Sequence, residues 1–328
     1  MKVAILSRNR RLYSTRRLAS AARRLRHTVQ VMDPLDITMM VSSRGTEAYL
    51  RGKPFPKVDA VIPRIGASIT FYGAAVVRQL QMMGMYVVNP ADAILNSRDK
   101  LRSLQILAQH GIPIPATGLA RRTDLARSLL KLVDGPPAVV KLLEGTQGAG
   151  VIKVDSRSGF NSTVDAFHSV GQNILVQQYI AEAGGSDLRV IVVGNQVVAA
   201  MRRQAKGDEF RSNVHRGGSV EAVRPDASVR RTAVRAARTL GLGFAGVDLV
   251  ESEAGPLVLE VNSSPGLEGI EKASGIDLGE VLMHHVEAET AKHHAGLKAR
   301  RAAAKRRAAA AKARAAAGRA HDGPARRR

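Results

Sequence analysis

The strongest constraint on the fold is a change of hydrophobic pattern near Gly111, where alternating strands and helices give way to hairpin-forming strands. The strand and helix patterns before this point cover residues 2–6, 15–26, 29–32, 58–62, 71–83 and 86–88. Such β-α-β alternation predicts a small open α/β domain with a mostly parallel sheet over residues 1–95. A long helix over residues 91–109 should end at Gly111, because glycine followed by prolines stops a helix.

The second half of the chain has a pattern that predicts antiparallel pairing. Strand-like segments lie at residues 138–143, 174–180, 190–193, 197–201, 246–250 and 257–261, and helical patterns at residues 123–133, 162–169, 226–240 and 277–291. Gly194 and Asn195 separate two of these strands and tolerate positive φ, so they predict a hairpin turn. We therefore expect an α+β domain over residues 96–290, and a fold class of α/β and α+β for the whole chain.

The end of the chain, residues 291–328, is rich in Ala, Lys and Arg. Residues 292–328 carry thirteen Lys or Arg and one acid, Asp322, so they contribute +12 to a net charge of +22. Alanine favours helix, but this segment has no apolar face wider than alanine with which to pack. We therefore predict a separate, disordered or fraying helical tail, whose charge attracts polyanions such as nucleic acid, a ribosomal surface or acidic peptide.

Composition limits both the chemistry and the compartment. The 328 residues include no Cys, which excludes disulfides, thiolate metal sites and a cysteine nucleophile, and fits a reducing cytoplasm. A short apolar run followed by Arg8 predicts a first strand at the N-terminus, not a signal peptide. No apolar stretch approaches the roughly 18 residues that a membrane helix needs. We expect a cytoplasmic protein with no membrane partner.

The first candidate site motif is an apolar strand that carries Lys141 and runs into a turn with Gly145, Gly148 and Gly150. The lysine supplies positive charge, and glycines allow backbone N–H groups to close on phosphate oxygens. No G-K-[ST] follows and the G-x-G-x-x-G spacing is not met, so this is neither a Walker A loop nor a dinucleotide fingerprint. An ordinary hairpin turn beside a surface lysine would give the same letters, so both interpretations stay open.

The second motif is a set of oxygen donors on two strand patterns. Glu260 and Asn262 alternate on one strand and so point to one face, and Asp248 lies on a strand that can pair beside them. Two carboxylates and an amide oxygen suit Mg²⁺ or Mn²⁺ shared with nucleotide phosphates. A glutamate among Val and Leu residues is also costly to bury without a partner. The alternative is a plain turn, because the Asn-Ser-Ser-Pro-Gly sequence is strong turn chemistry.

Other polar positions are less specific. Gln178 and Tyr179 end a strand, where polar residues are common, although they could present backbone groups to adenine. A basic series follows, consisting of Arg189, Arg202, Arg203, Lys206 and Arg211-Ser212-Asn213. Arginine forks bind phosphate in a fixed geometry, as ligation through an acyl phosphate would require. Arg202 and Lys206 also fit a solvated strand edge, whereas the sequence around Arg211 is more typical of a phosphate-side loop.

These motifs occur in one order, and here the chain resembles the RimK-type α-L-glutamate ligases of the ATP-grasp superfamily. The resemblance covers about residues 1–290 and is carried by MKVAILSR, VDAVIPRIG, SRDKLRSLQILA, VVKLLEGTQGAGV, ILVQQYI, EFRSNVHRGG, AGVDL and GPLVLEVNSSPGLEGIEKASGIDL. It implies an ATP-grasp fold with central and C-terminal lobes, preceded by a small Rossmann-like domain. Two features depart from the family pattern: Gln178 replaces the usual Glu, and the tail after residue 291 is additional.

The resemblance implies roles for individual residues. The implied ATP-binding residues are Lys100, Lys141, Gly145, Gly148, Gln178, Tyr179, Asp187, Arg211, Ser212 and Asn213. Asp248, Glu260 and Asn262 would hold two Mg²⁺ or Mn²⁺ ions, and Arg211 and Arg189 would act in catalysis. Separately, Arg64 stands at a strand end of the first domain and is a candidate anchor for a substrate carboxylate.

The family attaches L-glutamate to the C-terminus of a small-subunit ribosomal protein and can make short poly-α-glutamate. The resemblance therefore implies an ATP-dependent carboxylate–amine ligase with an acyl-phosphate intermediate. Two alternatives are an ATP-grasp ligase for another small-molecule or peptide carboxylate, and a non-catalytic RNA- or ribosome-binding protein. Residues 1–291 lack the interleaved aromatics that stack bases, which disfavours the second. We also expect ribosome or RNA contact through the tail, and a homo-oligomer.

Overall fold

The computed structural model describes residues 1–143, 150–206 and 218–321, with side chains described up to residue 311. Its N-terminal unit is a parallel sheet with the strand order β2-β1-β6-β7, as the β-α-β pattern predicted. The elements of this unit are β1 (Lys2–Leu6), α1 (Tyr13–Arg24), β2 (Thr28–Met32), β6 (Ala60–Pro63), α2 (Thr70–Met82) and β7 (Tyr86–Val87). The carboxyl ends of β1 and β6 lie side by side, and such edges bind ligands in open α/β sheets.

A small antiparallel sheet between β2 and β6 was not predicted. It consists of β3 (Ile37–Ser42), β4 (Gly45–Leu50) and β5 (Lys53–Pro54). A short 3-10 turn at Pro34–Asp36 precedes it, and another at Ala67–Ile69 lies between β6 and α2. Ser42 pairs with Gly45, so two residues form the first turn. Those residues, Ser43 and Arg44, lack the Asn-Gly or Asp-Gly signal of a two-residue hairpin. The sequence pattern therefore did not indicate the hairpin.

The single long helix expected over residues 91–109 is two helices. They are α3 (Ala91–Arg98) and α4 (Lys100–Gln109), and Asp99 between them has an extended backbone. The Asp99 carboxylate accepts a hydrogen bond from the backbone N–H of Arg102 at 2.9 Å, so it caps the second helix. This break matters for the site, because Arg98 and Lys100 stand on either side of it. Their positions relative to each other therefore differ from those in one continuous helix.

Two antiparallel sheets form the rest of the body. The smaller, ordered β10-β9-β11-β8, contains β8 (Thr117–Leu119), β9 (Ala138–Leu142), β10 (Val151–Val154) and β11 (Ile174–Gln178), with α5 (Thr123–Leu132) and α6 (Arg157–Ser169) packed against it. The larger, ordered β14-β13-β12-β15-β16, contains β12 (Ser186–Val193), β13 (Gln196–Gln204), β14 (Ser219–Ala222), β15 (Phe244–Ser252) and β16 (Gly255–Asn262), with α7 (Ala227–Thr239) packed against it. A 3-10 turn at Ala181–Ala183 leads from one sheet to the other. The predicted hairpin joins β12 to β13.

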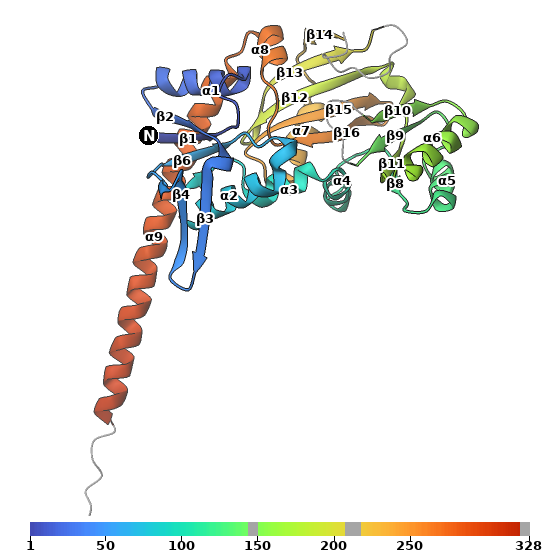
Figure 1. Ribbon diagram of the computed structural model, residues 1–328. Helices are drawn as coiled ribbons and strands as arrows, with labels where there is room; N and C mark the ends of the chain where they lie inside the picture. Colours follow the sequence, from blue (N-terminus) through green and yellow to red (C-terminus); the bar gives the residue numbers. More distant parts are fainter. Residues whose placement is uncertain (144–149, 207–217, 322–328) are drawn as a thin grey trace, which may run out of the picture.

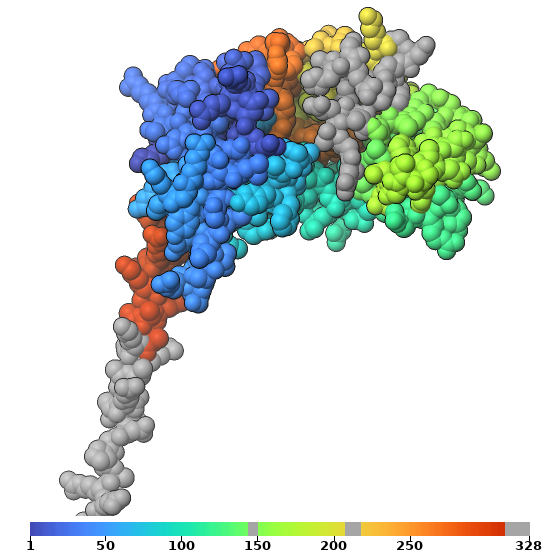
Figure 2. Space-filling view, in the orientation of Figure 1, coloured from blue at the N-terminus to red at the C-terminus, as the bar shows by residue number. Residues whose placement is uncertain are grey.

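The N-terminal unit packs directly on the larger sheet. One apolar cluster joins Val3 of β1 to Phe244 of β15 and Leu282 of the last helix. The buried Asn89 amide donates to the carbonyls of Phe244 and Ser263, each at 2.8 Å. Figure 2 shows the N-terminal unit in blue and the smaller sheet with its helices in green at opposite ends of the body. The larger sheet therefore lies between the smaller sheet and the N-terminal unit.

After α8 (Glu268–Ser274), the chain ends in one continuous helix, α9 (Leu278–His321), which projects away from the body (Figure 1). One face of its first turns is buried, and Nε2 of His293 lies 3.0 Å from the carbonyl oxygen of Gly84. The helix predicted over residues 277–291 continues into the basic segment, because Ala, Lys and Arg all continue a helix readily. The described side chains of residues 298–311 are exposed. Within the described ranges, no helix combines the length and apolar content needed to span a bilayer.

Candidate functional site

Two neighbouring strands carry the predicted oxygen donors. β15 and β16 pair antiparallel with Asp248 directly opposite Glu260, and Asn262 follows on the same side of β16. The register shifts immediately beyond this pair, where Leu249 faces Val258. A β-bulge therefore lies beside the two carboxylates, and bulges commonly re-aim side chains next to functional sites.

The three donors differ in exposure. Asp248 is buried, Asn262 is half-buried, and Glu260 is exposed. The sequence argument expected Glu260 to be buried among apolar neighbours. That expectation was wrong, because the side chain is exposed. The period-two alternation buries Val261 and turns Glu260 to the open side of the sheet. Its charge is therefore available to a ligand in that space.

Asp248 lies in a buried cluster of four charged side chains. Arg189 of β12 donates to both of its carboxylate oxygens, at 2.7 and 2.6 Å. Arg203 of β13 reaches one of the same oxygens at 3.2 Å and forms a bidentate pair with Asp187. The strand register produces this arrangement, because Arg189 stands opposite Asp248 and Arg203 stands opposite Asp187. The implied ATP contact of Asp187 and catalytic role of Arg189 stay predictions.

The cluster keeps its charges at physiological pH. Burial raises the pKa of the Asp248 carboxyl, but the charges of Arg189 and Arg203 outweigh burial and lower that pKa to about 2. Burial also lowers the pKa of Arg203, and the carboxylates of Asp248 and Asp187 more than reverse that shift. Two fixed carboxylates and two fixed guanidiniums thus form a rigid, nearly neutral floor beside Glu260.

Lys141 is a cation of the smaller sheet that the acids of this floor influence. It lies near the end of β9 and is half-buried. Burial lowers the pKa of its ammonium to about 8, and Glu260 is the carboxylate that opposes this shift most, ahead of Asp248 and Asp187. The lysine of one sheet is therefore within electrostatic reach of the acidic groups of the other. Because partial burial disfavours its ammonium, an anionic phosphate oxygen nearby would stabilise that charge.

Lys100 stands beside Lys141. It is the first residue of α4, and its Nζ donates to the carbonyls of Leu142 and Leu143 at 3.1 and 2.9 Å. Its charge is one of the causes that lower the pKa of Lys141. Two ammonium groups thus gather where β9 ends. Their predicted contacts with ATP stay predictions.

The predicted adenine hinge is held by its own hydrogen bonds. The backbone N–H of Gln178 donates to the Ala116 carbonyl at 2.8 Å, and its side-chain amide donates to Asp134 at 2.7 Å. The Nζ of Lys153 lies 4.8 Å from the ring centroid of Tyr179. Gln178 therefore fixes the end of β11 to neighbouring loops, and its contact with adenine stays a prediction. Five further predicted ligands, Gly145, Gly148, Arg211, Ser212 and Asn213, lie outside the described residues.

Sequence reasoning missed two arginines of this region. Arg203 was named only as a member of the basic series and given no role, yet it is 3% exposed, and its place two residues after the buried Met201 was the available signal. Arg98 at the end of α3 was not singled out at all. It stands beside Arg64, the predicted carboxylate anchor, whose Nη2 donates to the carbonyl of Pro265 at 2.7 Å.

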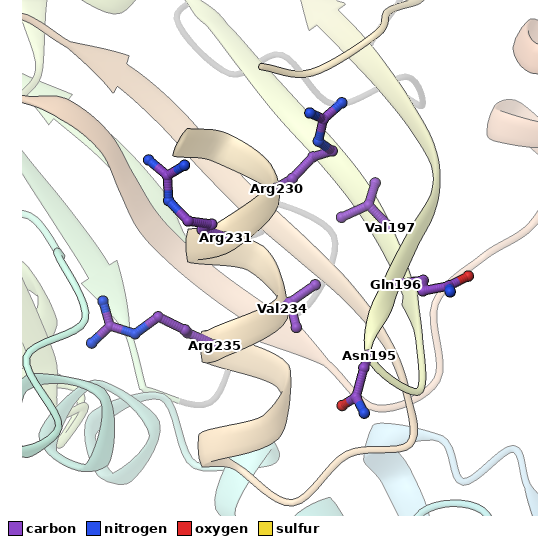
Figure 3. Close-up of a pocket in the computed structure, with 7 residues that line it drawn as sticks. All are labelled: Asn195, Gln196, Val197, Arg230, Arg231, Val234 and Arg235. Carbon is purple, nitrogen blue, oxygen red and sulfur yellow. The ribbon is translucent and has the colours of Figure 1, made fainter. Parts of the chain in front are cut away.

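A hollow of about 590 Å³ lies elsewhere, between the β12–β13 turn and α7. Figure 3 shows Arg230, Arg231 and Arg235 projecting from α7, with Asn195 and Gln196 on the turn opposite. Its described lining shares no residue with the predicted site. Size alone therefore does not locate the chemistry, whereas the converging charges of the two antiparallel sheets do.

The donor set fits a hard divalent cation. Asp248 and Glu260 are opposed on adjacent strands, and the Asn262 amide stands beside them. A carboxylate has about four lone-pair positions, so Asp248 can serve its arginines and a cation together. Over the described ranges, no three or more His, Cys, Asp or Glu side chains form a metal site of their own. The site would therefore need the amide and ligand oxygens, as is usual for Mg²⁺ held with nucleotide phosphates.

Comparison with known proteins agrees with this geometry. A model described as "RimK-like ATP-grasp domain" matches residues 97–286, and one described as "RimK PreATP-grasp domain" matches residues 1–94. The chain is 54% identical over 287 residues to a "Probable alpha-L-glutamate ligase" of Marinomonas sp. (strain MWYL1), covering 88% of this chain and 95% of the relative. It is 52% identical to the protein of the same name from Thioalkalivibrio sulfidiphilus (strain HL-EbGR7), covering 92% of this chain and all of the relative.

Solved structures share the fold. The ATP-grasp ligase PsnB complexed with minimal precursor, Mg and ADP superposes with a TM-score of 0.69 at 21% identity, covering 88% of this chain and 98% of that one. A RimK domain protein from Sphaerobacter thermophilus DSM 20745 gives a TM-score of 0.65 at 24% identity, covering 87% and 99%. The expected fold of a small α/β unit followed by an ATP-grasp domain is thus confirmed. The chain belongs to the RimK-like ATP-grasp family of ligases.

Proposed function

We propose that this protein is an ATP-dependent ligase that joins L-glutamate to the C-terminal carboxylate of a small-subunit ribosomal protein through an acyl phosphate. Relatives named as probable alpha-L-glutamate ligases, more than half identical over most of the chain, support glutamate as the amino acid. A peptide acceptor is consistent with the fold-level likeness to PsnB, a ligase solved with its precursor peptide. Repeated addition would produce short poly-α-glutamate.

One observation carries the proposal: Lys141 at the end of a strand of the smaller sheet is within electrostatic reach of Glu260 and Asp248, which are paired across two strands of the larger sheet. A triphosphate between the sheets would meet an ammonium on one side and oxygen donors for its cation on the other. A lysine placed near a pair of metal-type oxygen donors suits an anionic ligand that brings its own cation. The pairing therefore favours phosphoryl chemistry over simple RNA binding.

The proposed reaction has two steps. A carboxylate oxygen of the acceptor attacks the γ-phosphorus of ATP, and ADP leaves with the electron pair of the broken P–O bond. The glutamate amine then attacks the acyl carbon, inorganic phosphate leaves, and the amine proton is lost as the amide forms. No protein nucleophile is required, which agrees with the absence of cysteine.

This chain would contribute positioning and fixed charge. Lys141 and Lys100 would hold phosphate oxygens, and the end of β11 at Gln178 and Tyr179 would receive the adenine. Two Mg²⁺ or Mn²⁺ ions held by Asp248, Glu260 and Asn262 would neutralise phosphate charge. Arg189 and Arg203 keep Asp248 ionised and oriented, so the donor face is preorganised before ATP binds.

The direct test is intact-mass analysis of candidate acceptors. Purified small ribosomal subunits are incubated with the protein, ATP, Mg²⁺ and L-glutamate, and one ribosomal protein should gain mass in steps of one glutamyl residue. Omission of ATP should abolish every step. Mass gain on an added small molecule or free peptide, with no ribosomal protein changed, would replace the acceptor by the alternative ligase reaction.

The exposed basic part of α9 adds a second proposal about partners. Its described cations include Lys298, Lys305 and Arg306, and no acid accompanies them between residues 298 and 311. We propose that this part of α9 binds ribosomal RNA and so brings the acceptor to the site. RNA binding by this helix would not replace ligase activity. In this proposal it is an additional property of the ligase.

A further inference from the structure

Two arginines from the N-terminal unit meet beside the metal-donor strand. Arg64 directly follows β6, and Arg98 is the last residue of α3. Arg64 donates to the carbonyl of Pro265, three residues after Asn262, and Arg98 donates to the carbonyl of Ile65 at 2.5 Å. Both guanidiniums are thus fixed through one of their nitrogens to main-chain oxygens. They are held by the fold and are not surface side chains free to move.

Each guanidinium also has a nitrogen with unmet hydrogen-bonding capacity. Nη1 of Arg64 and Nε of Arg98 are shielded from solvent, and neither has a hydrogen-bond partner among the described residues. A buried donor without an acceptor is unfavourable by about 1–3 kcal/mol, and more when it is charged. Native proteins retain such groups mainly where a ligand completes them.

The electrostatics point the same way. Burial and, to a lesser degree, the neighbouring charge of Arg98 together lower the pKa of Arg64 to about 10. Burial also lowers the pKa of Arg98, and Glu260 is the group that opposes the shift. Two like charges are therefore held together with incomplete neutralisation. An anion placed between them would relieve both the repulsion and the unmet donors.

We propose that Arg64 and Arg98 together bind a carboxylate of the incoming amino acid that takes no part in bond formation. This rests on the proposed ligation of glutamate, whose two carboxylates both remain unreacted. Arg98 is two residues before Lys100 and within electrostatic reach of Glu260, so the bound amino acid would lie next to the phosphate side of the site.

The reacting carboxylate is the poorer candidate for this position. Two charge-assisted donors withdraw electron density from a carboxylate and would weaken it as a nucleophile toward phosphorus. Phosphorylation would also remove the negative charge that both arginines require. A spectator carboxylate keeps its charge through both steps, so the anchor holds while the amine attacks. Arg64 and Arg98 would thus set specificity for an acidic or carboxyl-bearing amine.

The test couples each arginine to each carboxylate of glutamate. Arg98→Met and Arg64→Lys are compared with wild type on glutamate, on glutamine, and on glutamate amidated at its α-carboxyl. Arg98→Met should raise KM for glutamate about 10- to 100-fold, with the Kd for ATP within twofold. In wild type, both amides should have a higher KM than glutamate. In Arg98→Met, one of the two amides should have the same KM as glutamate, and the carboxylate that this amide lacks is the anchored one. Arg98→Lys should recover part of the loss.

A binding readout separates this proposal from the proposed function. Amino-acid binding is measured by calorimetry with a non-hydrolysable ATP analogue and Mg²⁺, without turnover. Arg78→Met is the matched control, since Arg78 is an exposed arginine of the same unit paired with Asp92. If wild type binds glutamate but transfers none, the proposed function fails alone. If Arg98→Met binds glutamate and both amides as wild type does, the anchor is overturned.

Discussion

The arginines of the ion cluster and the cations of α9 are opposite uses of positive charge. Arg189 and Arg203 are largely or fully buried, and each has carboxylate partners at fixed distances. Lys298, Arg300 and their neighbours to residue 311 are exposed along a helix that leaves the body. The first group gains specificity from pairing. The second keeps its charge unneutralised by the chain, so its attraction acts at longer range and weakens with salt.

The spacing of the second group suggests what it recognises. Lys298 and Lys305 are seven residues apart, as are Arg300 and Arg307. Seven residues make almost two helical turns and a rise of about 10 Å, so each pair recurs on its own side of the helix. A regular row of cations suits a regular row of phosphates, whereas the converging groups of the ion cluster suit one compact ligand.

The largest effect should come from the floor of the site. Glu260→Gln removes a charge that both Lys141 and a bound cation would use, so we expect kcat to fall about 1000-fold. ADP release in the presence of acceptor and glutamate measures this. Glu251→Gln is the matched control, because Glu251 is an exposed acid of the adjacent strand paired with Arg202. Retention of more than a tenth of the wild-type rate in Glu260→Gln would contradict the assignment.

Substitution of a paired arginine should lower the free energy of unfolding much more than substitution of an unpaired one. Arg203→Met leaves Asp187 and Asp248 partly uncompensated in a buried position, and we expect the protein to lose about 3 kcal/mol. Arg300→Met on the exposed helix should change stability by less than about 0.5 kcal/mol. Urea unfolding followed by circular dichroism compares the two. Equal midpoints would mean that the ion cluster is not a rigid part of the fold.

Lys141 should make ATP binding depend on pH. Its pKa is lowered to about 8 in the free protein, and bound phosphate would raise it. The ammonium is therefore complete below pH 8 and is lost as pH rises through 8, so ATP affinity should fall up to about tenfold per unit above that value. Calorimetry between pH 7 and about 9.5 measures this. Lys141→Arg cannot titrate there, and the same pH dependence in that variant would exclude Lys141 as its source.

The sequence predicted those parts of the site that depend on local period. Asp248 and Glu260 were placed on adjacent strands, because alternation and apolar flanks define both strands without tertiary information. Lys141 was found from its strand and the glycines that follow. The interruption between α3 and α4 was also written locally, in the capping residue Asp99, but helical periodicity continues across it and concealed the break.

The parts that could not be predicted depend on packing between distant segments. Arg203 looks like its neighbour Arg202 until the register with β12 places it over Asp187. Arg98 gains its meaning only when the N-terminal unit docks on the loop at Pro265, which follows β16. In the sequence, such groups resemble ordinary surface charges. Arg189 and its partner Asp248 are 59 residues apart, and no local pattern shows that Arg189 contacts a carboxylate and not solvent.

The smallest effect on ligation itself should come from removing the exposed helix. A chain ending at Leu297 keeps the contact of His293 with Gly84, and every described side chain that it loses is exposed. On a short peptide acceptor, its kcat should stay within twofold of the full chain, because no described part of the removed segment touches the site. On intact ribosomal subunits at low salt, KM should rise, and the slope of log affinity against log salt should flatten.

A matched variant that keeps the helix but replaces Lys305, Arg306 and Arg307 by Gln separates charge from length. If that variant binds ribosomal RNA as the full chain does at every salt concentration, the row of cations is not the determinant, and the contrast between the two groups of charges loses its functional meaning.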